Sequence, residues 1–405
     1  GIADARIDSS HVRPHSRPAA RRIPPLIPSR GPMARVLLAP DKFKGTLSGA
    51  EVAAALAEGI RSRRPTADVV AVPVADGGDG SLAAFEAVGF QRVALLATGA
   101  TGRATRTWYV RRGEEAVVEL AELAGLAGLH GALAPLTATS RGLGEAIAHA
   151  LDAGCTRVLV GIGGSASTDG GLGLVQALGA RVRDASGSEV APGGAGAATA
   201  ATLDLGGLHP RLATTRIEVA CDVDNPLTGP EGAAAVYGPQ KGAEPAQVRQ
   251  LDTALTHWAD VVAAATGHDH RADPGAGAAG GIGFAAVAIL GARIRPGAPL
   301  MLDTLGFADA LAGADLVVTG EGSLDEQTLR GKAPAAVAAA GRAAGVPVIA
   351  VAGRCLLDGP RLQAAGFDRV YTLLDEAATP QQALDEAASL LRRIGARLGD
   401  RLPDA

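Results

Sequence analysis

The chain has 405 residues, of which 47% are hydrophobic and 20% charged, and its formal net charge is -4. This length exceeds one ordinary core and predicts two domains with a cleft between them. The small net charge and the lack of a long apolar stretch exclude nucleic acid and membrane as expected partners. Three widely spaced cysteines, Cys155, Cys221 and Cys355, fit neither a disulfide framework nor a zinc pair, and they indicate a cytoplasmic protein.

The first segment, residues 1–32, contains six arginines and several prolines and has no periodic apolar pattern. Such a segment cannot bury enough apolar surface to fold alone, so we expect a disordered extension. It lacks the apolar region of a secretory signal, and its prolines disfavour the helix of a mitochondrial transit peptide. Met33 directly precedes the first strand pattern and is a candidate start of the natural chain.

From Arg35 onward, strand and helix patterns alternate, which predicts an α/β fold with a largely parallel sheet. Residues 36–39 form a short apolar run typical of a strand. A Ser-x-x-Glu capping box at Ser48 and Glu51 then begins a helix. The apolar stripe of that helix consists of Val52, Leu56 and Ile60.

The pattern recurs downstream, where Leu143, Ile147 and Leu151 predict a helix that ends at Gly154. A glycine- and alanine-rich stretch at 193–202 predicts a linker or loop. The further predicted elements are strands at 69–74, 157–162, 217–220, 315–319 and 346–351, a helix from near Pro245 to Gly267, and a capping box at Ser323 and Glu326.

Ligands bind at the carboxyl ends of parallel strands, because helix N-termini there offer unpaired N–H groups and a partial positive charge. Five loops at such positions combine glycine with carboxylate or lysine. They cover residues 41–45, 76–80, 161–171, 222–242 and 320–332.

Lysine is scarce in this chain, since only four of its 38 basic residues are lysines. A compact ammonium group suits a transferring phosphoryl group better than the larger, planar guanidinium does. All four lysines lie in glycine-rich segments and are therefore candidate anion ligands: Lys42, Lys44, Lys241 and Lys332.

The loop at 161–171 contains consecutive glycines, whose N–H groups approach an anion without obstruction by a Cβ. It is a candidate phosphate or carboxylate cradle. The candidate ligands in this loop are Gly163, Gly164, Ser165 and Ser167.

A dinucleotide site is the alternative interpretation of the same loop. Gly161, Gly163 and Ala166 satisfy the G-x-G-x-x-A fingerprint, and Asp184 lies about 20 residues further on, where a ribose-binding carboxylate would lie. This predicts an NAD(P)-dependent oxidoreductase that uses Gly161 to Ala166 as its dinucleotide loop. Against it, residues 165–171 prolong the loop where the helix of such a site would begin.

Several carboxylates follow predicted strands and can bind Mg²⁺ or accept a proton. Asp76 and Asp169 are the first candidates for a base or a water-linked Mg²⁺ ligand, with Asp222 and Glu321 as alternates. Asp222 and Asp224 form a candidate metal pair, since a hard cation needs few protein oxygens when phosphates supply the rest. In the last loop the candidate substrate or nucleotide phosphate ligands are Glu321, Asp325 and Lys332.

Several common catalytic motifs are missing from the sequence. It has no Gly-x-Ser-x-Gly elbow, no His-Glu-x-x-His and no Walker-type Gly-x-x-x-x-Gly-Lys-Ser/Thr. A Ser/His hydrolase and a zinc enzyme therefore have little support.

Taken together, the loops resemble one family, the bacterial glycerate kinases with a two-domain α/β fold. Lys42 and Thr168 depart from the family pattern, in which many members have serine and asparagine, so a direct role for these two side chains is in doubt. The matching segments, in the family's order, are APDKFKGTLSG (39–49), VADGGDG (74–80), GIGGSASTDGG (161–171), CDVDNPLTGP (221–230), VYGPQKGA (236–243), GAAGGIG (277–283) and TGEGSLDEQTLRGKAP (319–334).

The resemblance implies a discontinuous Rossmann-like parallel-sheet domain made from residues 33–80 and 296–405. It also implies an inserted α/β domain at 81–295, with the active site in the interdomain cleft. The implied activity is phosphorylation of D-glycerate with ATP and Mg²⁺, usually to 2-phosphoglycerate. A homodimer is a candidate assembly. Lys44 and Lys241 are expected either to neutralise the transferring phosphate or to hold the glycerate carboxylate.

Overall fold

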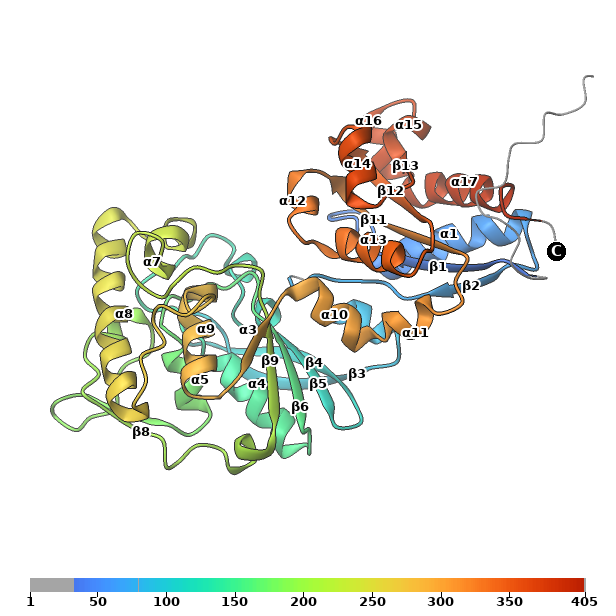
Figure 1. The fold of residues 1–405 in the computed structure, drawn as a ribbon. Coiled ribbons are helices and arrows are strands. Elements are labelled where there is room, and N and C mark those ends of the chain that lie inside the picture. The colour runs from blue at the N-terminus through green and yellow to red at the C-terminus, as the bar shows by residue number, and fades with distance from the viewer. Residues whose placement is uncertain (1–32, 79, 404–405) are drawn as a thin grey trace, which may run out of the picture.

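The computed structural model describes residues 33–78 and 80–403, and the expected extension at residues 1–32 lies outside them. Strands from both ends of the described chain form one five-stranded sheet, the first sheet, in the order β13-β12-β11-β1-β2 (Figure 1). All its neighbouring strands are parallel. The strands are β1 (Arg35–Pro40), β2 (Asp68–Ala71), β11 (Leu316–Leu324), β12 (Val348–Cys355) and β13 (Arg369–Thr372).

The intervening chain forms a six-stranded second sheet in the order β10-β9-β6-β5-β4-β3. Four of its strands are parallel, and β3 and β4 add an antiparallel edge. The strands are β3 (Gln91–Thr98), β4 (Ala104–Arg112), β5 (Glu115–Glu119), β6 (Arg157–Gly161), β9 (Arg216–Ala220) and β10 (Arg293–Arg295). A small antiparallel pair, β7 (Arg181–Arg183) and β8 (Thr202–Asp204), stands apart.

Alternate residues of the buried strands point to opposite faces of the first sheet, so both faces are apolar. Helices cover each of them. Val36 and Leu38 pack with helices α1 (Gly49–Arg63) and α17 (Ala387–Gly399). Leu37 belongs to the cluster on the other face, which includes α13 (Ala333–Ala343). The predicted stripe of α1 is confirmed as buried, and the Ser48–Glu51 capping box is present.

The second sheet has its own apolar core against helices α4 (Arg141–Asp152), α5 (Leu172–Ala177), α8 (Pro245–Thr266) and α9 (Ala278–Ala288). The predicted helix through Leu143 and Leu151 is confirmed as α4. The predicted long helix at Pro245 is α8, closed by Gly267 in the left-handed conformation. This two-sheet α/β architecture agrees with the fold expected from the sequence.

The cluster on the α13 face of the first sheet also joins the two sheets, through helices α2 (Leu82–Ala87), α10 (Gly297–Leu305) and α11 (Phe307–Leu311). Figure 1 shows α10 and α11 between the two parts of the molecule. The cluster contains Leu37 from β1 together with Leu159 and Ala220 from the second sheet. Since these helices pack against both parts, the domain boundaries near residues 80 and 296 stay a prediction.

The remaining helices are short. They are α3 (Leu120–Ala124), η1 (Ala127–Leu129), α6 (Gly194–Ala197), η2 (Pro210–Thr214), α7 (Ala233–Tyr237), η3 (Pro239–Lys241), α12 (Glu326–Leu329), α14 (Gly359–Ala365), α15 (Leu373–Glu376) and α16 (Pro380–Asp385). Within the described part of the chain, no helix is both long and apolar enough to cross a bilayer.

Two local predictions were wrong. Ser323 does not begin a helix, because β11 continues through it and pairs it with Arg354 of β12. Asp325 is the N-cap of α12 instead, and its Oδ1 accepts a hydrogen bond of 2.9 Å from the N–H of Gln327. The stretch at 193–202 is not all loop, since it contains the short helix α6.

Candidate active site

The first cavity of the site lies at the carboxyl ends of β6 and β9 and has a volume of about 470 Å³. We call it the Lys241 cavity. The residues that carry its chemistry come from three of the predicted loops, those at 76–80, 161–171 and 222–242. They are Asp76, Gly163, Gly164, Ser165, Asp222 and Lys241.

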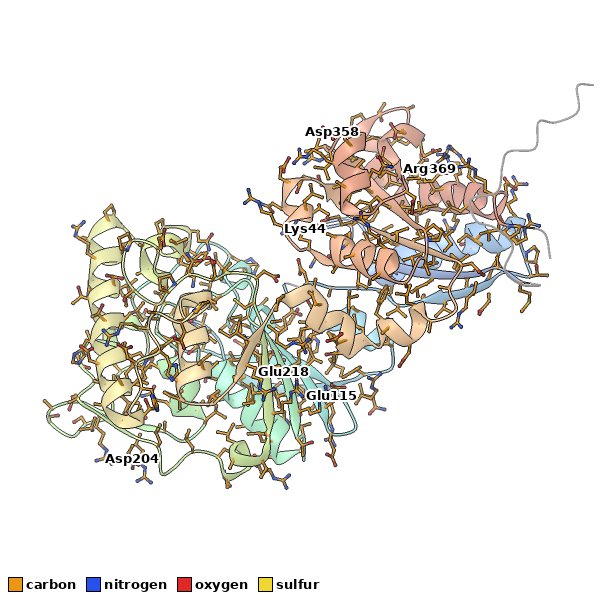
Figure 2. All side chains as sticks on the ribbon, viewed as in Figure 1. Lys44, Glu115, Asp204, Glu218, Asp358 and Arg369 are labelled. Atoms are coloured by element: carbon orange, nitrogen blue, oxygen red, sulfur yellow. The ribbon has the colours of Figure 1, made fainter. Side chains whose placement is uncertain are left out.

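The second cavity, the Lys44 cavity, lies at the carboxyl ends of β1 and β11 and has a volume of about 650 Å³. Figure 2 shows Lys44 on the side of the first-sheet part that faces the second sheet. The two cavities share Asp76 and Gly78. The charged residues around the Lys44 cavity are Asp41, Lys42, Lys44, Asp76, Glu321, Asp325, Lys332 and Arg354.

Glycines let the loops of the two parts touch through their backbones. A Cβ built on Gly161 would lie 2.7 Å from the carbonyl oxygen of Gly77, and one on Gly163 would lie 3.0 Å from the Cα of Gly78. Any side chain at Gly161 would therefore push the two loops apart. Glycine is needed here for close approach as well as for anion binding.

Lys241 is buried, with 2% of its surface exposed. Its Nζ donates to the carbonyl oxygen of Ser167 at 2.5 Å and to the hydroxyl of Ser165 at 3.3 Å. Burial lowers the pKa of Lys241 to about 8, although the charge of Asp169 opposes that shift. No carboxylate of the described residues forms an ion pair with this ammonium group, so a bound anion would supply its missing counter-charge.

Asp169, a candidate base, is fully buried and lies outside the lining of both cavities. Its carboxylate accepts hydrogen bonds from the N–H and the hydroxyl of Ser140 at 2.8 Å each. It also accepts from the N–H groups of Gly171 and Gly173 at 3.2 Å each. Ser167 is buried too and contributes its backbone carbonyl, not its hydroxyl, to Lys241. Both residues therefore support the conformation of the loop at 161–171 from its buried side.

Asp222 lines the Lys241 cavity together with Asp76. One oxygen of Asp222 accepts a hydrogen bond of 2.7 Å from the N–H of Gly297 at the start of α10. Burial raises the pKa of Asp222, and the negative charge of Asp76 raises it further. Asp224, the other predicted metal ligand, is exposed and does not line either cavity. Of the predicted pair, only Asp222 therefore lines the Lys241 cavity.

Glu321 is buried at the wall of the Lys44 cavity. Its carboxylate accepts a hydrogen bond of 2.6 Å from the hydroxyl of Thr328 and lies 3.6 Å from Nζ of Lys332. Burial raises the pKa of Glu321 despite these contacts. Asp325 lines the same cavity while it caps α12.

Sequence reasoning did not single out Asp41, although it lies within one of the five loops. Asp41 directly follows β1, and burial, with a smaller contribution from Asp76, raises its pKa to about 7. A hydrogen bond of 2.6 Å from the N–H of Lys42 acts in the opposite direction. Its position at a strand end, beside Lys42 and Lys44, is the sequence feature that could have identified it.

Glu119 was also missed, since it belongs to no glycine loop. It ends β5, is buried, and accepts hydrogen bonds from the N–H groups of Gly80 at 2.6 Å and Leu82 at 3.1 Å. It thereby ties the loop after Asp76 to the second sheet. A carboxylate at the end of an apolar strand pattern was the available sequence feature.

The dinucleotide alternative finds no support in this geometry. Helix α5 begins only at Leu172, so the loop is prolonged as the sequence indicated. Asp184 accepts hydrogen bonds from Ser186 within its own loop beside β7. Asp204 of β8, the strand that pairs with β7, lies far from Lys44 at the opposite end of the second-sheet part (Figure 2).

Comparison with known proteins gives a consistent result. The model of the glycerate kinase family matches residues 36–402. The chain is 42% identical to the glycerate kinase of Bacillus subtilis (strain 168), over 89% of this chain and 95% of that one. It is 41% identical to the glycerate 2-kinase of Escherichia coli (strain K12), over 90% and 98%.

A solved structure of a protein assigned as glycerate kinase 2 from Salmonella typhimurium LT2 has the same fold, with a TM-score of 0.82 and 44% identity. The match covers 91% of this chain and 97% of that one. The fold and the site together define a two-domain α/β kinase. The chain belongs to the glycerate kinase family, which confirms the resemblance found in the sequence and removes the oxidoreductase alternative.

Proposed function

We propose that this protein is a cytoplasmic enzyme that transfers the γ-phosphoryl group of ATP to the 2-hydroxyl of D-glycerate. Family membership supports glycerate as the substrate, and the printed name of the Escherichia coli relative, a glycerate 2-kinase, supports the 2-hydroxyl. The carrying observation is the buried ammonium of Lys241, which faces a cavity together with glycine N–H groups and two carboxylates.

The chain's own residues suit a reaction that needs mainly positioning and neutralisation of charge. Lys241, Ser165 and the N–H groups near Gly163 bind an anion. Asp76 lies on both cavities and is the candidate that accepts the proton of the attacking hydroxyl. The lysines of the Lys44 cavity bind phosphate oxygens.

The donor set fits Mg²⁺ held mainly by nucleotide phosphates. The described residues contain no group of three or more metal-ligating side chains. A hard cation in a kinase needs only one or two protein carboxylates, and Asp76 and Asp222 face the same cavity with like charges that repel. Asp222 would hold the ion, which leaves Asp76 as the base, and the ion would supply neutralisation of charge on the phosphoryl group.

The test is formation of ADP from ATP with and without D-glycerate, followed by ³¹P NMR of the product. Glycerate-dependent ADP formation and phosphate on the secondary carbon are expected. Phosphate on the primary carbon would contradict the 2-hydroxyl assignment, and ADP formation that ignores glycerate would contradict the substrate. The homodimer expected from the sequence stays a prediction, and light scattering would check it.

A further inference from the structure

The two cavities differ in the kind of charge that surrounds them. Lys241 is the single cation on the lining of its cavity, which also carries the carboxylates of Asp76 and Asp222. A triphosphate has about four negative charges at neutral pH and keeps about two of them with one Mg²⁺ bound, so one lysine against two carboxylates does not balance it. A small acid with one negative charge and two hydroxyl groups matches this set.

The Lys44 cavity has the opposite character. Four cations line it, and Lys42 and Lys44 form no ion pair among the described residues. Carboxylates line the same cavity, among them Asp41 and Glu321, and they can hold the metal cations that accompany a polyphosphate. This mixture suits a metal–polyphosphate complex better than a small acid.

Apolar side chains line the outer wall of the Lys44 cavity. Leu374 of α15 and Leu384 of α16 are 41% and 57% exposed, although both are large hydrophobic residues. Pro380 and Ala383 extend the same wall. Exposed leucines beside a cluster of cations form a surface that a nucleotide base would cover.

The topology of the first sheet places the Lys44 cavity at a general ligand position. In the strand order β13-β12-β11-β1-β2, β2 lies on one side of β1, whereas β11, β12 and β13 follow one another on its other side. The order in which the chain adds strands therefore reverses between β1 and β11. Crevices at such a reversal, outside the carboxyl ends of the strands, are where open α/β sheets bind ligands. The loop after β1 and the end of β11 both line this cavity.

We infer that the nucleotide binds in the Lys44 cavity, with its base against Leu374 and Leu384, and that the acid binds in the Lys241 cavity. The two meet at Asp76 and Gly78, the residues that the cavities share. This assignment rests on the proposed function and divides its two substrates between the two parts of the site.

The experiment is calorimetric titration of the full chain with Mg-ADP and, separately, with D-glycerate. Leu374→Gln combined with Leu384→Gln should weaken ADP binding by about tenfold or more and leave glycerate binding within about twofold. Leu356→Gln is the matched control, because Leu356 is 64% exposed on the same part of the molecule but lies outside both cavities. It should change neither affinity.

Lys241→Gln should give the converse pattern, with glycerate binding lost and ADP binding retained. Since Lys241 is buried, a second variant guards against misfolding: Val223→Trp fills the same cavity from a residue that is 39% exposed. The reverse pattern, in which the leucine variants lose glycerate and the Lys241-cavity variants lose ADP, would overturn the inference. Wild-type turnover with glycerate would still stand in that case, whereas absence of turnover would contradict the proposed function itself.

Discussion

The carbonyl oxygen of Gly77 occupies the space that a side chain at Gly161 would need, since a Cβ built on Gly161 would lie 2.7 Å from it. Two loops that are far apart in the sequence thus meet without side chains between them. One comes from the first part of the chain and carries Asp76. The other is the anion loop of the second sheet. Their contact sets the distance across the site.

Gly161→Ala should therefore separate these loops. We expect the free energy of unfolding to fall by about 1–3 kcal/mol, as for other overpacked contacts. The loss of kcat should be larger than this change suggests, because misplacement by about 1 Å costs on the order of a hundredfold in rate. Gly128→Ala is the control, since a Cβ there meets nothing within 4 Å. Unchanged kcat in Gly161→Ala would show that the loop contact does not set the active geometry.

Asp76 and Asp169 were equal candidates in the sequence, and the structure gives them different surroundings. Asp76→Asn should lower kcat on the order of a hundredfold or more and leave the melting temperature nearly unchanged. Asp169→Asn should instead destabilise the protein by about 2–4 kcal/mol, because four donors lose a buried carboxylate partner. Thermal denaturation and steady-state kinetics on both variants would distinguish the roles, and a fully stable but inactive Asp169→Asn would restore it as a catalytic candidate.

Local features of the sequence predicted much of this structure. The Ser48–Glu51 box and the stripe through Leu56 depend on residues three or four apart, and both are present. Lys241 was a candidate because lysine is scarce in this chain, and that observation needs no knowledge of the fold. By contrast, the burial of Asp169 depends on Ser140, which lies 29 residues earlier and meets it only after the second sheet has formed.

The same limit explains the other misses. Ser323 has the pattern of a helix cap, yet pairing with β12 overrides that local preference and extends β11 through it. Glu119 binds N–H groups from a loop 37 and 39 residues away, and no local pattern predicts such a contact. The division of the site into two cavities is likewise a property of the assembled sheets.

The raised pKa of Asp41 predicts how stability depends on pH. Its pKa is about 7 in the folded chain, against an ordinary aspartate pKa of 3.8. The folded state therefore retains a proton that the unfolded state has released, and stability falls as the pH rises toward 7. From pH 5 to 8, Asp41→Asn should remove on the order of 2 kcal/mol of this decline. Denaturant unfolding without Mg²⁺ or nucleotide would measure it.

Asp385→Asn is the control for Asp41, because Asp385 is exposed on α16. This variant should keep the slope of the wild type. If Asp41→Asn also kept that slope, the proton would not reside on Asp41 in the folded chain.

Lys241 gives the last prediction, which concerns binding instead of stability. Its pKa is lowered to about 8, because burial disfavours the charged ammonium. Only the protonated form can hold the carboxylate of an acid. The affinity for D-glycerate should therefore be constant below pH 8 and fall about tenfold per pH unit above it. Lys241→Arg keeps its charge at every accessible pH, so whatever affinity it retains should not fall in this range.

Calorimetric titration with glycerate between pH 7 and 10 measures the affinity of the wild type and of this variant. The affinity for ADP, titrated on the same samples, should not fall with pH in this way, since Lys241 lies outside the Lys44 cavity. A wild-type affinity that stays flat to pH 10 would show that Lys241 does not bind the acid.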